Sequence, residues 1–444
     1  IFVIIVNLLA AGSASAQSWT TETVDSTGTV GSYTSIALDT SGKAYISYYD
    51  GTNGDLKYST NASGSWVIVT VDSSGDVGRF SSIALDSSGK AYISYYDWTN
   101  DDLKYATNAS GSWTTTTVAS SGTVGQFSSI ALDSSGKAYI SYYDWTNDDL
   151  KYATNASGSW TTTTVAAATG QYTSIALDSS GKAYISHYDG INGDLKYSTN
   201  ASGSWVTTTV DSPGSVGAYT SIALNSSGWA YISYYDSTNG DLKYATNASE
   251  SWVTETVDST GNVGAYTSIA LNSSGKAYIS YNNDQSEWGY LKYTTNASGS
   301  WVTTTADSTV DIFFLYTSIA LDSSGNAYIS YYNGSNGDLK YATNATSTSA
   351  PTVTTGSATS VTTSSATLNG TVTANGLSTT AWFDYGTTSS SYTGSSTTQS
   401  VRGTSSTAVG IGISGLSAAT TYYYRIAAGN SAGTSTGSEA SFTT

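Results

Sequence analysis

Residues 35–50 read SIALDTSGKAYISYYD, and similar strings recur along the first 345 residues of the chain. Two short runs rich in β-branched and aromatic residues flank the turn at 39–42, which is typical of a β-hairpin. In the second run, residues 44–49, both alternating faces carry large side chains. A strand that is buried on both faces has this pattern. The stretch therefore predicts sheets that pack face to face against similar sheets.

A tryptophan marks each copy of the repeat, and successive tryptophans lie 47, 47, 47, 45, 47 and 49 residues apart. The seven positions are Trp19, Trp66, Trp113, Trp160, Trp205, Trp252 and Trp301. The first copy contains four short β-like runs, at 19–24, 33–39, 43–50 and 55–61. Four antiparallel strands that recur every 40 to 50 residues, roughly, are typical of propeller blades. The sequence therefore predicts an all-β protein with a seven-bladed β-propeller over residues 18–345.

The ends of the repeat predict how the ring closes. The last copy ends after the strand near 340–344 with no tryptophan strand behind it, whereas the chain's first strand is a tryptophan strand. We therefore expect residues 19–24 to complete the seventh blade, in a 1+3 closure. If the strands of a blade are named A to D from the inside outward, the D–A and B–C loops share one rim. We call it the B–C rim and expect it to be free for a ligand.

The termini indicate an exported protein. Residues 1–17 combine a short apolar run with Ala14-Ser15-Ala16, a pattern typical of a signal-peptidase site, and we interpret them as the remainder of a signal peptide. An uncleaved N-terminal anchor is the alternative. The run is shorter than the 20 or so apolar residues of a membrane span, and we expect no membrane insertion of the mature chain. The chain contains no cysteine and has a formal net charge of −17. An acidic surface repels phosphate backbones, so nucleic acid is not an expected partner.

A linker at 346–350 leads to a second predicted domain, 351–444, in which Val/Thr/Ala-rich runs alternate with Gly/Ser turns. The segments 416–422 and 424–433 resemble the tyrosine corner and following strand of fibronectin type III modules, with Ala418 in place of the usual proline. The resemblance implies a β-sandwich of the kind that serves as a spacer or adhesion unit in secreted bacterial proteins.

The propeller copies resemble the tandem propeller repeats of secreted bacterial proteins, on the shared core at 35–47. They are also distantly similar to the Asp-box of sialidases. The sequence departs from that box, since Asp-x-x-Gly is followed here by Ala-Tyr. The resemblance therefore implies a fold and no activity.

Catalytic residue types are scarce in the predicted propeller. His187 is the only histidine of the chain, and it stands where the other copies have tyrosine, so we interpret it as a packed substitute. Acids outside the repeat pattern, such as Glu22, Glu250 and Asp311, are scattered over different copies. A pair of carboxylates would suffice for glycoside hydrolysis. We therefore expect no enzyme, with a glycoside hydrolase or lyase as a remote alternative.

The B–C loops carry the candidate ligand site. In the first copy, residues 49–55 bring an aromatic ring, carboxylates and an amide together, which are the groups that recognise sugars. The candidate residues are Tyr49, Asp50, Asp55, Tyr96, Asp97, Trp98, Tyr143, Asp144, Trp145, Tyr188, Asp189, Asp194, Tyr235, Asp236 and Asp241. Two alternatives remain for the aspartates. They are suited to Asx turns, and their spacing is a weak match to a Ca²⁺-binding loop. We expect no other cofactor.

One loop departs from the repeat. Where other copies have Gly-x-Val-Gly before strand A, the seventh has the apolar tip Ile312, Phe313, Phe314 and Leu315. An exposed apolar tip suggests a protein contact, including self-assembly, and the alternative is a cap on the central opening. The leading hypothesis is a secreted or cell-surface binding or adhesion module for a glycan or extracellular protein. A structural subunit of an extracellular layer or fibre is the alternative.

Overall fold

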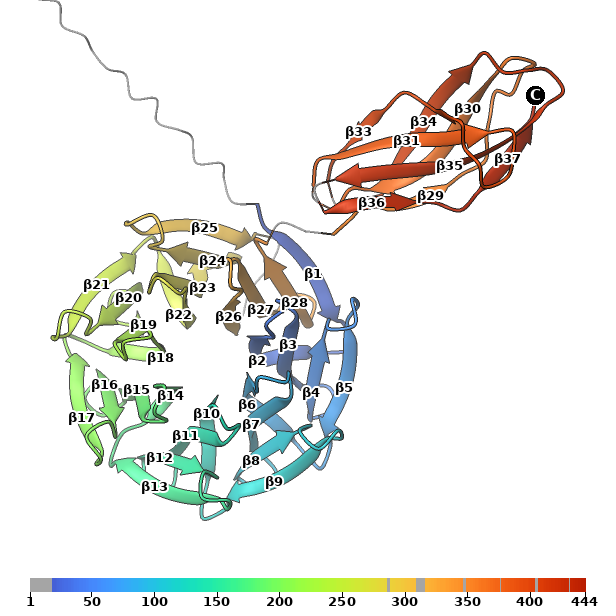
Figure 1. Cartoon of the computed structure of the whole chain (residues 1–444). Coiled ribbons are helices and arrows are strands. Elements are labelled where there is room, and N and C mark those ends of the chain that lie inside the picture. Colours follow the sequence, from blue (N-terminus) through green and yellow to red (C-terminus); the bar gives the residue numbers. More distant parts are fainter. Residues whose placement is uncertain are drawn as a thin grey trace, which may run out of the picture. The chain divides into compact units, whose positions relative to one another are not determined.

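The computed structural model describes residues 18–285, 288–308, 316–345, 349–375, 377–403, 406–430 and 432–444. The chain divides into two compact units, Ile1–Asn344 and Ala345–Thr444. Almost every regular element is a β-strand (Figure 1). No helix among the described residues is long and apolar enough to cross a membrane. The candidate apolar tip at 312–315 lies outside the described residues.

The first unit is a ring of seven four-stranded antiparallel sheets, each of which is one blade. Blade 1 consists of β2 (Val30–Leu38), β3 (Ala44–Asp50), β4 (Asp55–Thr60) and β5 (Val67–Asp72). Blade 2 consists of β6 (Val77–Leu85), β7 (Ala91–Asp97), β8 (Asp102–Thr107) and β9 (Thr114–Ala119). Blade 3 consists of β10 (Val124–Leu132), β11 (Ala138–Asp144), β12 (Asp149–Thr154) and β13 (Thr161–Ala166). Blade 4 consists of β14 (Gln171–Leu177), β15 (Ala183–Asp189), β16 (Asp194–Thr199) and β17 (Val206–Asp211).

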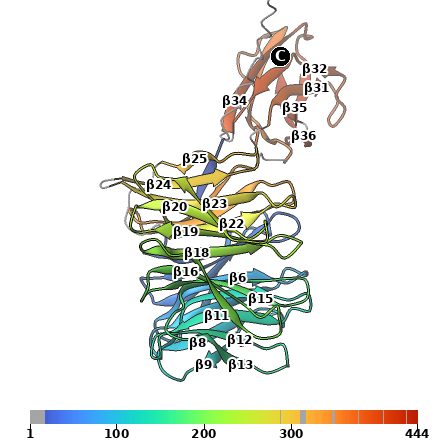
Figure 2. The same cartoon turned by 90° about the vertical axis from the view of Figure 1, so that its left-hand side faces the viewer.

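The remaining blades follow the same order. Blade 5 consists of β18 (Val216–Leu224), β19 (Ala230–Asp236), β20 (Asp241–Thr246) and β21 (Val253–Asp258). Blade 6 consists of β22 (Asn262–Leu271), β23 (Ala277–Gln285), β24 (Trp288–Thr295) and β25 (Val302–Asp307). Blade 7 consists of β26 (Thr317–Leu321), β27 (Ala327–Asn333), β28 (Asp338–Thr343) and β1 (Thr20–Asp25). Figure 2 shows this ring from its side.

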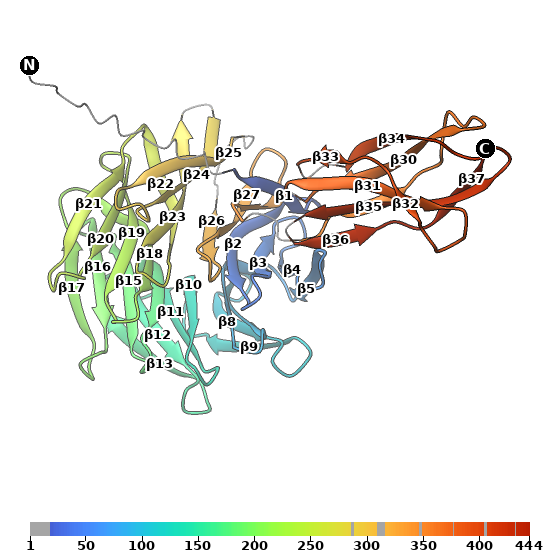
Figure 3. The same cartoon turned by 45° about the horizontal axis from the view of Figure 1, so that its top comes forward.

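The predicted ring closure is confirmed. The chain's first strand, β1, pairs antiparallel with β28, with Thr20 opposite Thr343 and Thr23 opposite Lys340. Figure 1 shows β1 next to β28 as the outer strand of blade 7, and Figure 3 shows the same blade from another side. The two ends of the propeller sequence thus share one sheet, which closes the ring without a loose edge at the join.

The inner strand of blade 1 begins at Val30, three residues before the predicted start at Tyr33. The reason is a bulge, because the register with β3 shifts between Ser32 and Ser35. Gly31 precedes the bulge at φ 110°, and a Cβ there would lie 2.8 Å from the Cα of Leu339 in the neighbouring blade. The bulge turns Tyr33 out of the sheet, toward the axis of the ring.

Buried polar contacts join neighbouring blades. Asp72, at the end of the outer strand of blade 1, accepts hydrogen bonds from the Tyr95 hydroxyl (2.7 Å) and from Lys104 Nζ (2.6 Å) of blade 2. Burial alone would raise the pKa of Asp72, but Lys104, Ser74 and Tyr95 hold it below its usual value. We call this residue the junction aspartate. Its equivalents are Asp25, Asp211, Asp258 and Asp307, whereas Ala119 and Ala166 take this place at the two junctions of blade 3.

The tryptophans that mark the repeat also act at the junctions. Trp113, which precedes the outer strand of blade 2, packs edge to face against Tyr58 of blade 1, with ring centroids 5.1 Å apart. Trp160, Trp205, Trp252 and Trp301 make the same contact with the preceding blade. The repeat is therefore a packing unit that is completed only by its neighbour.

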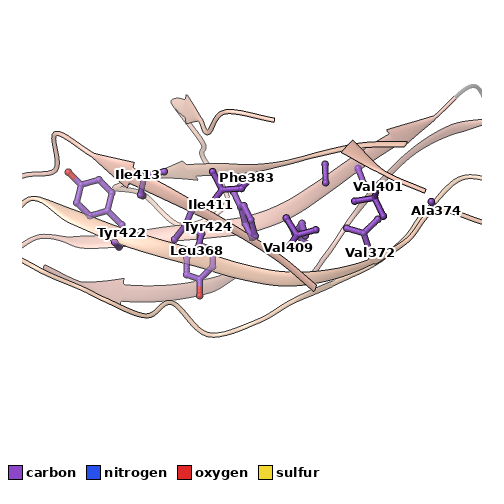
Figure 4. Close-up of a cluster of buried hydrophobic side chains, with 14 of the residues drawn as sticks. Leu368, Val372, Ala374, Phe383, Val401, Val409, Ile411, Ile413, Tyr422 and Tyr424 are labelled. Atoms are coloured by element: carbon purple, nitrogen blue, oxygen red, sulfur yellow. The ribbon is translucent and has the colours of Figure 1, made fainter. Parts of the chain in front are cut away.

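The second unit contains two antiparallel sheets. One sheet joins β29 (Thr352–Thr355), β30 (Ser365–Thr373) and β34 (Ser406–Ser414). The other joins β31 (Thr379–Gly386), β32 (Gly394–Ser395), β33 (Gln399–Val401), β35 (Thr421–Asn430), β36 (Gly433–Thr436) and β37 (Ala440–Thr443). Leu368, Phe383 and Tyr424 are fully buried in the core of this unit (Figure 4). The Tyr422 hydroxyl accepts a hydrogen bond from the Ser417 N–H at 3.0 Å, as the resemblance to a tyrosine corner implies.

Candidate functional site

The D–A and B–C loops are hydrogen-bonded to one another along the B–C rim. The Gly51 N–H of blade 1 donates to the Thr29 carbonyl at 2.8 Å, and the Val77 N–H of blade 2 donates to the Gly54 carbonyl at 2.9 Å. In blades 1, 2, 3 and 5 the B–C loop is thus anchored on both sides, to the D–A loop of its own blade and to the start of the next blade. Over these blades the rim is therefore a pre-formed surface rather than a set of free loops.

The first aspartate of each candidate loop lies beneath the loop. Asp50 is 2% exposed, and its carboxylate accepts hydrogen bonds from the Thr52 and Asn53 N–H groups and from the Asn53 side-chain amide. Asp97, Asp144, Asp189 and Asp236 are equally buried and hold the loop asparagine in the same way. This placement favours the Asx-turn alternative, because the carboxylates are used in shaping the loop.

The aspartate that begins strand C is half-buried in blades 1, 4 and 5. Burial and the nearby charge of Asp50 raise the pKa of Asp55. Burial and the nearby charge of Asp236 raise the pKa of Asp241 in the same way. Asp194 instead pairs with Lys196 at 2.9 Å. The described residues contain no group of three or more histidine, cysteine, aspartate or glutamate side chains that is arranged to hold a metal ion.

The tyrosines of the candidate loops connect the rim to the interior. The Tyr49 hydroxyl donates to Asp76 Oδ1 at 2.8 Å in the next D–A loop. The equivalent hydroxyls of Tyr188 and Tyr235 bond to Ser215 and Asn262 in the same manner. Tyr96 and Tyr143, in contrast, are buried and donate to Asp101 and Asp148 of their own loops.

Blades 2 and 3 present an exposed indole on the rim. Trp98 is 50% exposed and Trp145 is 59% exposed, and each packs edge-on against the buried tyrosine two residues earlier, at 6.0 Å between ring centroids. The other candidate loops have glycine or serine at this position. In blade 2 the Arg79 guanidinium stacks on Trp98 at 4.3 Å and pairs with Asp76 at 2.7 Å. Trp145 has no such arginine beside it, because Gln126 replaces Arg79 in blade 3.

An aspartate accompanies each exposed indole. Asp101 and Asp148 lie at φ 60° and 58°, in the left-handed region where the other described B–C loops of this length have glycine. Each carboxylate accepts a hydrogen bond from the hydroxyl of the loop tyrosine. Burial and this hydrogen bond raise the pKa of Tyr143 to about 12. Strained backbone at two matched positions beside two exposed aromatics marks these loops as candidates for binding.

Seven aromatic residues that the sequence did not predict as a set form a ring around the central channel. In blades 1 to 6 this residue comes from the bulge in strand A, in blade 7 it directly precedes β26, and each of the seven is half-buried. Neighbouring ring centroids lie 4.3 to 4.6 Å apart all the way round. These residues, the channel aromatics, are Tyr33, Phe80, Phe127, Tyr172, Tyr219, Tyr266 and Tyr316. A signal was present, because an aromatic residue occupies this position in every copy.

His187 has the packing role that its place in the repeat predicted. The side chain is fully buried, with Nδ1 at 3.1 Å from Thr169 Oγ1 and Nε2 at 3.0 Å from Ser198 Oγ. Burial lowers the pKa of His187 to about 3, so the ring is neutral near pH 7. The neutral His187 ring is enclosed by these two hydroxyl groups and is not exposed to a ligand.

No family model matches the sequence, and no curated protein matches it. Among solved structures, a polysaccharide lyase of family PL25, an ulvan lyase, is similar with a TM-score of 0.50 and 11% identity over 72% of this chain and 95% of that chain. The same enzyme bound to -[GlcA(1-4)Rha3S]- gives 0.50 and 12%. The NanB sialidase of Streptococcus pneumoniae gives 0.38 and 13%, over 72% of this chain and 69% of that chain. The chain thus shares its propeller fold with a polysaccharide lyase.

Proposed function

We propose that the protein binds carbohydrate through the B–C rim, with the indoles of Trp98 and Trp145 as the surfaces on which sugar rings stack. The observation that carries the proposal is the pair of half-exposed indoles on adjacent blades. An indole gives apolar area to the C–H face of a sugar ring, while neighbouring polar groups bond to its hydroxyls. In folded proteins an indole normally buries most of its area.

The polar groups beside the indoles support the same ligand. Asp101 and Asp148 offer carboxylate oxygens on the rim, and Arg79 offers guanidinium donors next to Trp98. These groups are already held by the tyrosines and by Asp76, so little ordering is needed on binding. Two platforms on one rigid rim also permit one chain to contact both, which raises the apparent affinity.

We further propose that the protein binds without turnover and acts outside the cell, as an adhesion or capture module with a spacer of the fibronectin type III kind. The scarcity of catalytic groups supports the first point, since the only histidine is buried and neutral. The acidic, cysteine-free composition and the resemblance of residues 416–433 to a secreted module support the second.

The test is a binding assay of the full chain on immobilised polysaccharides, with the wild type and the double variant Trp98→Ala/Trp145→Ala. We expect the variant to lose between about 10-fold and 100-fold in affinity, since each aromatic contact contributes about 0.5–1.5 kcal/mol. Ile191→Ala is the matched control, because Ile191 is 66% exposed on the B–C loop of blade 4. Its affinity should equal that of the wild type.

Undiminished binding by the double variant would overturn the proposed role of the indoles. An equal loss with Ile191→Ala would indicate a general apolar effect instead. In the same samples we expect no new reducing ends and no unsaturated products after prolonged incubation. Their appearance would contradict binding without turnover.

A further inference from the structure

The channel aromatics line a cavity near the start of each strand A, the end of the strand that follows the D–A loop. Its volume is about 370 Å³, within the range of small-ligand sites. The lining contains the seven channel aromatics and the serine or threonine that directly follows each of them, which we call the channel hydroxyls. The described lining therefore contains no formally charged side chain, and every lining group is an aromatic ring or a hydroxyl.

Most channel hydroxyls are used inside the protein. Six of them pair with a serine of the strand B next to them, as in Thr220 to Ser186 at 2.9 Å and Thr34 to Ser330 at 2.8 Å. Such pairs join neighbouring blades around the channel. They show that a hydroxyl in this position ordinarily finds a partner within the fold.

Thr173 of blade 4 is different. Thr173 is only 6% exposed, and its Oγ1 has no hydrogen-bond partner. The strand B serine that corresponds to the partner in the other blades, Ser141, also has an unpartnered Oγ. A buried hydroxyl without a partner costs about 1–3 kcal/mol. Thr173 lines the cavity, and a small shift of its side chain would bring this unpartnered hydroxyl within reach of a polar ligand there.

The cavity is connected to the proposed binding surface by aromatic contacts in blades 2 and 3. Phe80 lies 6.3 Å from Tyr96, which lies 6.0 Å from Trp98. Phe127 contacts Tyr143 and then Trp145 at the same distances. In blades 1, 4 and 5 the corresponding contacts end at the loop tyrosine, with no indole beyond it. Tyr96 and Tyr143 are themselves buried, so the exposed aromatic surface over blades 2 and 3 is that of the two indoles, which a chain leaving the cavity in this direction would reach.

We infer that the cavity takes the terminal unit of a neutral polysaccharide, while the rest of the chain extends over Phe80 and Phe127 to the two indoles. The inference rests on the proposed function and specifies its ligand. Aromatic faces match the C–H groups of a sugar ring, and hydroxyls match its hydroxyls. A lining without charge offers nothing to a uronate or sulfated sugar, and the excess negative charge of the propeller repels one.

The experiment uses the full chain and competition by neutral glycans. Starch, cellulose, mannan and galactan are each compared with their own hexasaccharides at equal mass. A protein that captures chain ends is inhibited far more by the hexasaccharides, which offer more ends for the same mass. We expect an excess of at least about tenfold for the recognised glycan, and no inhibition by polygalacturonate.

Two variants separate the cavity from the indoles. Thr173→Val removes the unpartnered hydroxyl at constant shape, and we expect about a fivefold to tenfold loss of hexasaccharide binding, as for one hydrogen bond. Its urea midpoint should equal or exceed that of the wild type, because no internal bond is lost. Tyr234→Phe is the control that removes an internal bond outside the cavity lining, the one to Asp211, and it should lower the urea midpoint without the same loss of hexasaccharide preference.

The outcomes separate this inference from the function on which it rests. If polymer and hexasaccharide inhibit equally per mass, and Thr173→Val binds like the wild type while Trp98→Ala/Trp145→Ala does not, the chain-end inference is overturned and the function stands. If Thr173→Val loses hexasaccharide binding while the indole variant does not, the cavity is supported and the indole surface is overturned. If no neutral glycan competes while an anionic polysaccharide binds through the indoles, the chain-end inference is overturned and the function stands. If no polysaccharide binds at all, both are overturned.

Discussion

Blade 1 and blade 3 have the same strands and the same register, but different side chains complete them. Blade 1 is joined to both neighbours by a junction aspartate, Asp25 on one side and Asp72 on the other. Both junctions of blade 3 have alanine there, Ala119 and Ala166. Without that partner, the Lys151 side chain of blade 3 is 23% exposed, whereas its counterpart in blade 1, Lys57, is 9% exposed.

The loops of the two blades differ in the opposite sense. Blade 1 has glycine at 51 and 54, whereas blade 3 has Trp145 and the strained Asp148. Blade 3 also contributes Ser141, one of the two unpartnered hydroxyls next to the cavity. Blade 3 thus lacks the junction aspartate on both sides and carries an exposed and a strained group, whereas blade 2, with the same two kinds of group, keeps Asp72 at one of its junctions. A binding site built at the expense of stability has this distribution.

The largest effect that we expect concerns the junction aspartate. Asp72→Ala leaves Lys104 buried without its closest partner and should lower the free energy of unfolding by about 3 kcal/mol. The reciprocal change in blade 3, Ala119→Asp, offers an acceptor to Tyr142 and Lys151 and should raise it by about 1 kcal/mol. Urea unfolding of both variants measures the two changes. A destabilised Ala119→Asp protein would show that blade 3 differs from blade 1 in more than this side chain.

A smaller effect is expected from acid at the junction between blades 3 and 4. Because burial lowers the pKa of His187 to about 3 from an ordinary 6.5, only the unfolded chain takes up a proton between these values. The stability from neutral His187 is complete above pH 6.5 and is lost as the pH falls toward 3. Between pH 7 and 4.5 the loss is about 2 to 3 kcal/mol.

The control for this prediction is His187→Tyr. Blade 3 already has a tyrosine, Tyr142, in the same position beside Ala119 and 2% exposed, so the substitution has a precedent within the ring. Tyrosine does not titrate in this range, and the difference in unfolding free energy between variant and wild type should grow as the pH is lowered. Parallel pH profiles would show that carboxylates, such as Asp72 with its lowered pKa, account for the acid sensitivity instead.

The sequence predicted the ring and included the two indoles among its candidates, but it did not predict the cavity. The regular spacing of Trp19 and its counterparts, and the unpaired first strand, were sufficient for the blades and for their closure, because each repeat must pack on the next. The channel aromatics were missed because Tyr33 was interpreted as an ordinary strand residue. The bulge that turns it inward lies beside Gly31, which packs closely against Leu339, a residue distant in the sequence.

The loop residues show the same limit. Asp50 and Trp98 were both candidates, since the sequence places both at predicted B–C loops, of blades 1 and 2. Only the fold shows that the carboxylate is turned inward onto the loop's own N–H groups while the indole remains exposed. Likewise, Ala119 is an unremarkable residue until the strand register places it opposite Leu103, where Asp72 stands opposite Leu56 in blade 1.

The smallest expected change in stability is also the one that most directly links strain to binding. Asp101→Gly/Asp148→Gly relieves two left-handed aspartates, at about 1 kcal/mol each, and gives up two tyrosine hydrogen bonds of similar worth. The unfolding free energy should therefore change by less than about 1 kcal/mol, while glycan affinity falls about fivefold. Gly54→Asp in blade 1 is the converse. It introduces the strain at φ 75° where Tyr49 is already bonded to Asp76, so it should only destabilise. If Asp101→Gly/Asp148→Gly gains stability and keeps its affinity, the aspartates have no part in binding, and the difference between blades 1 and 3 reduces to the indoles.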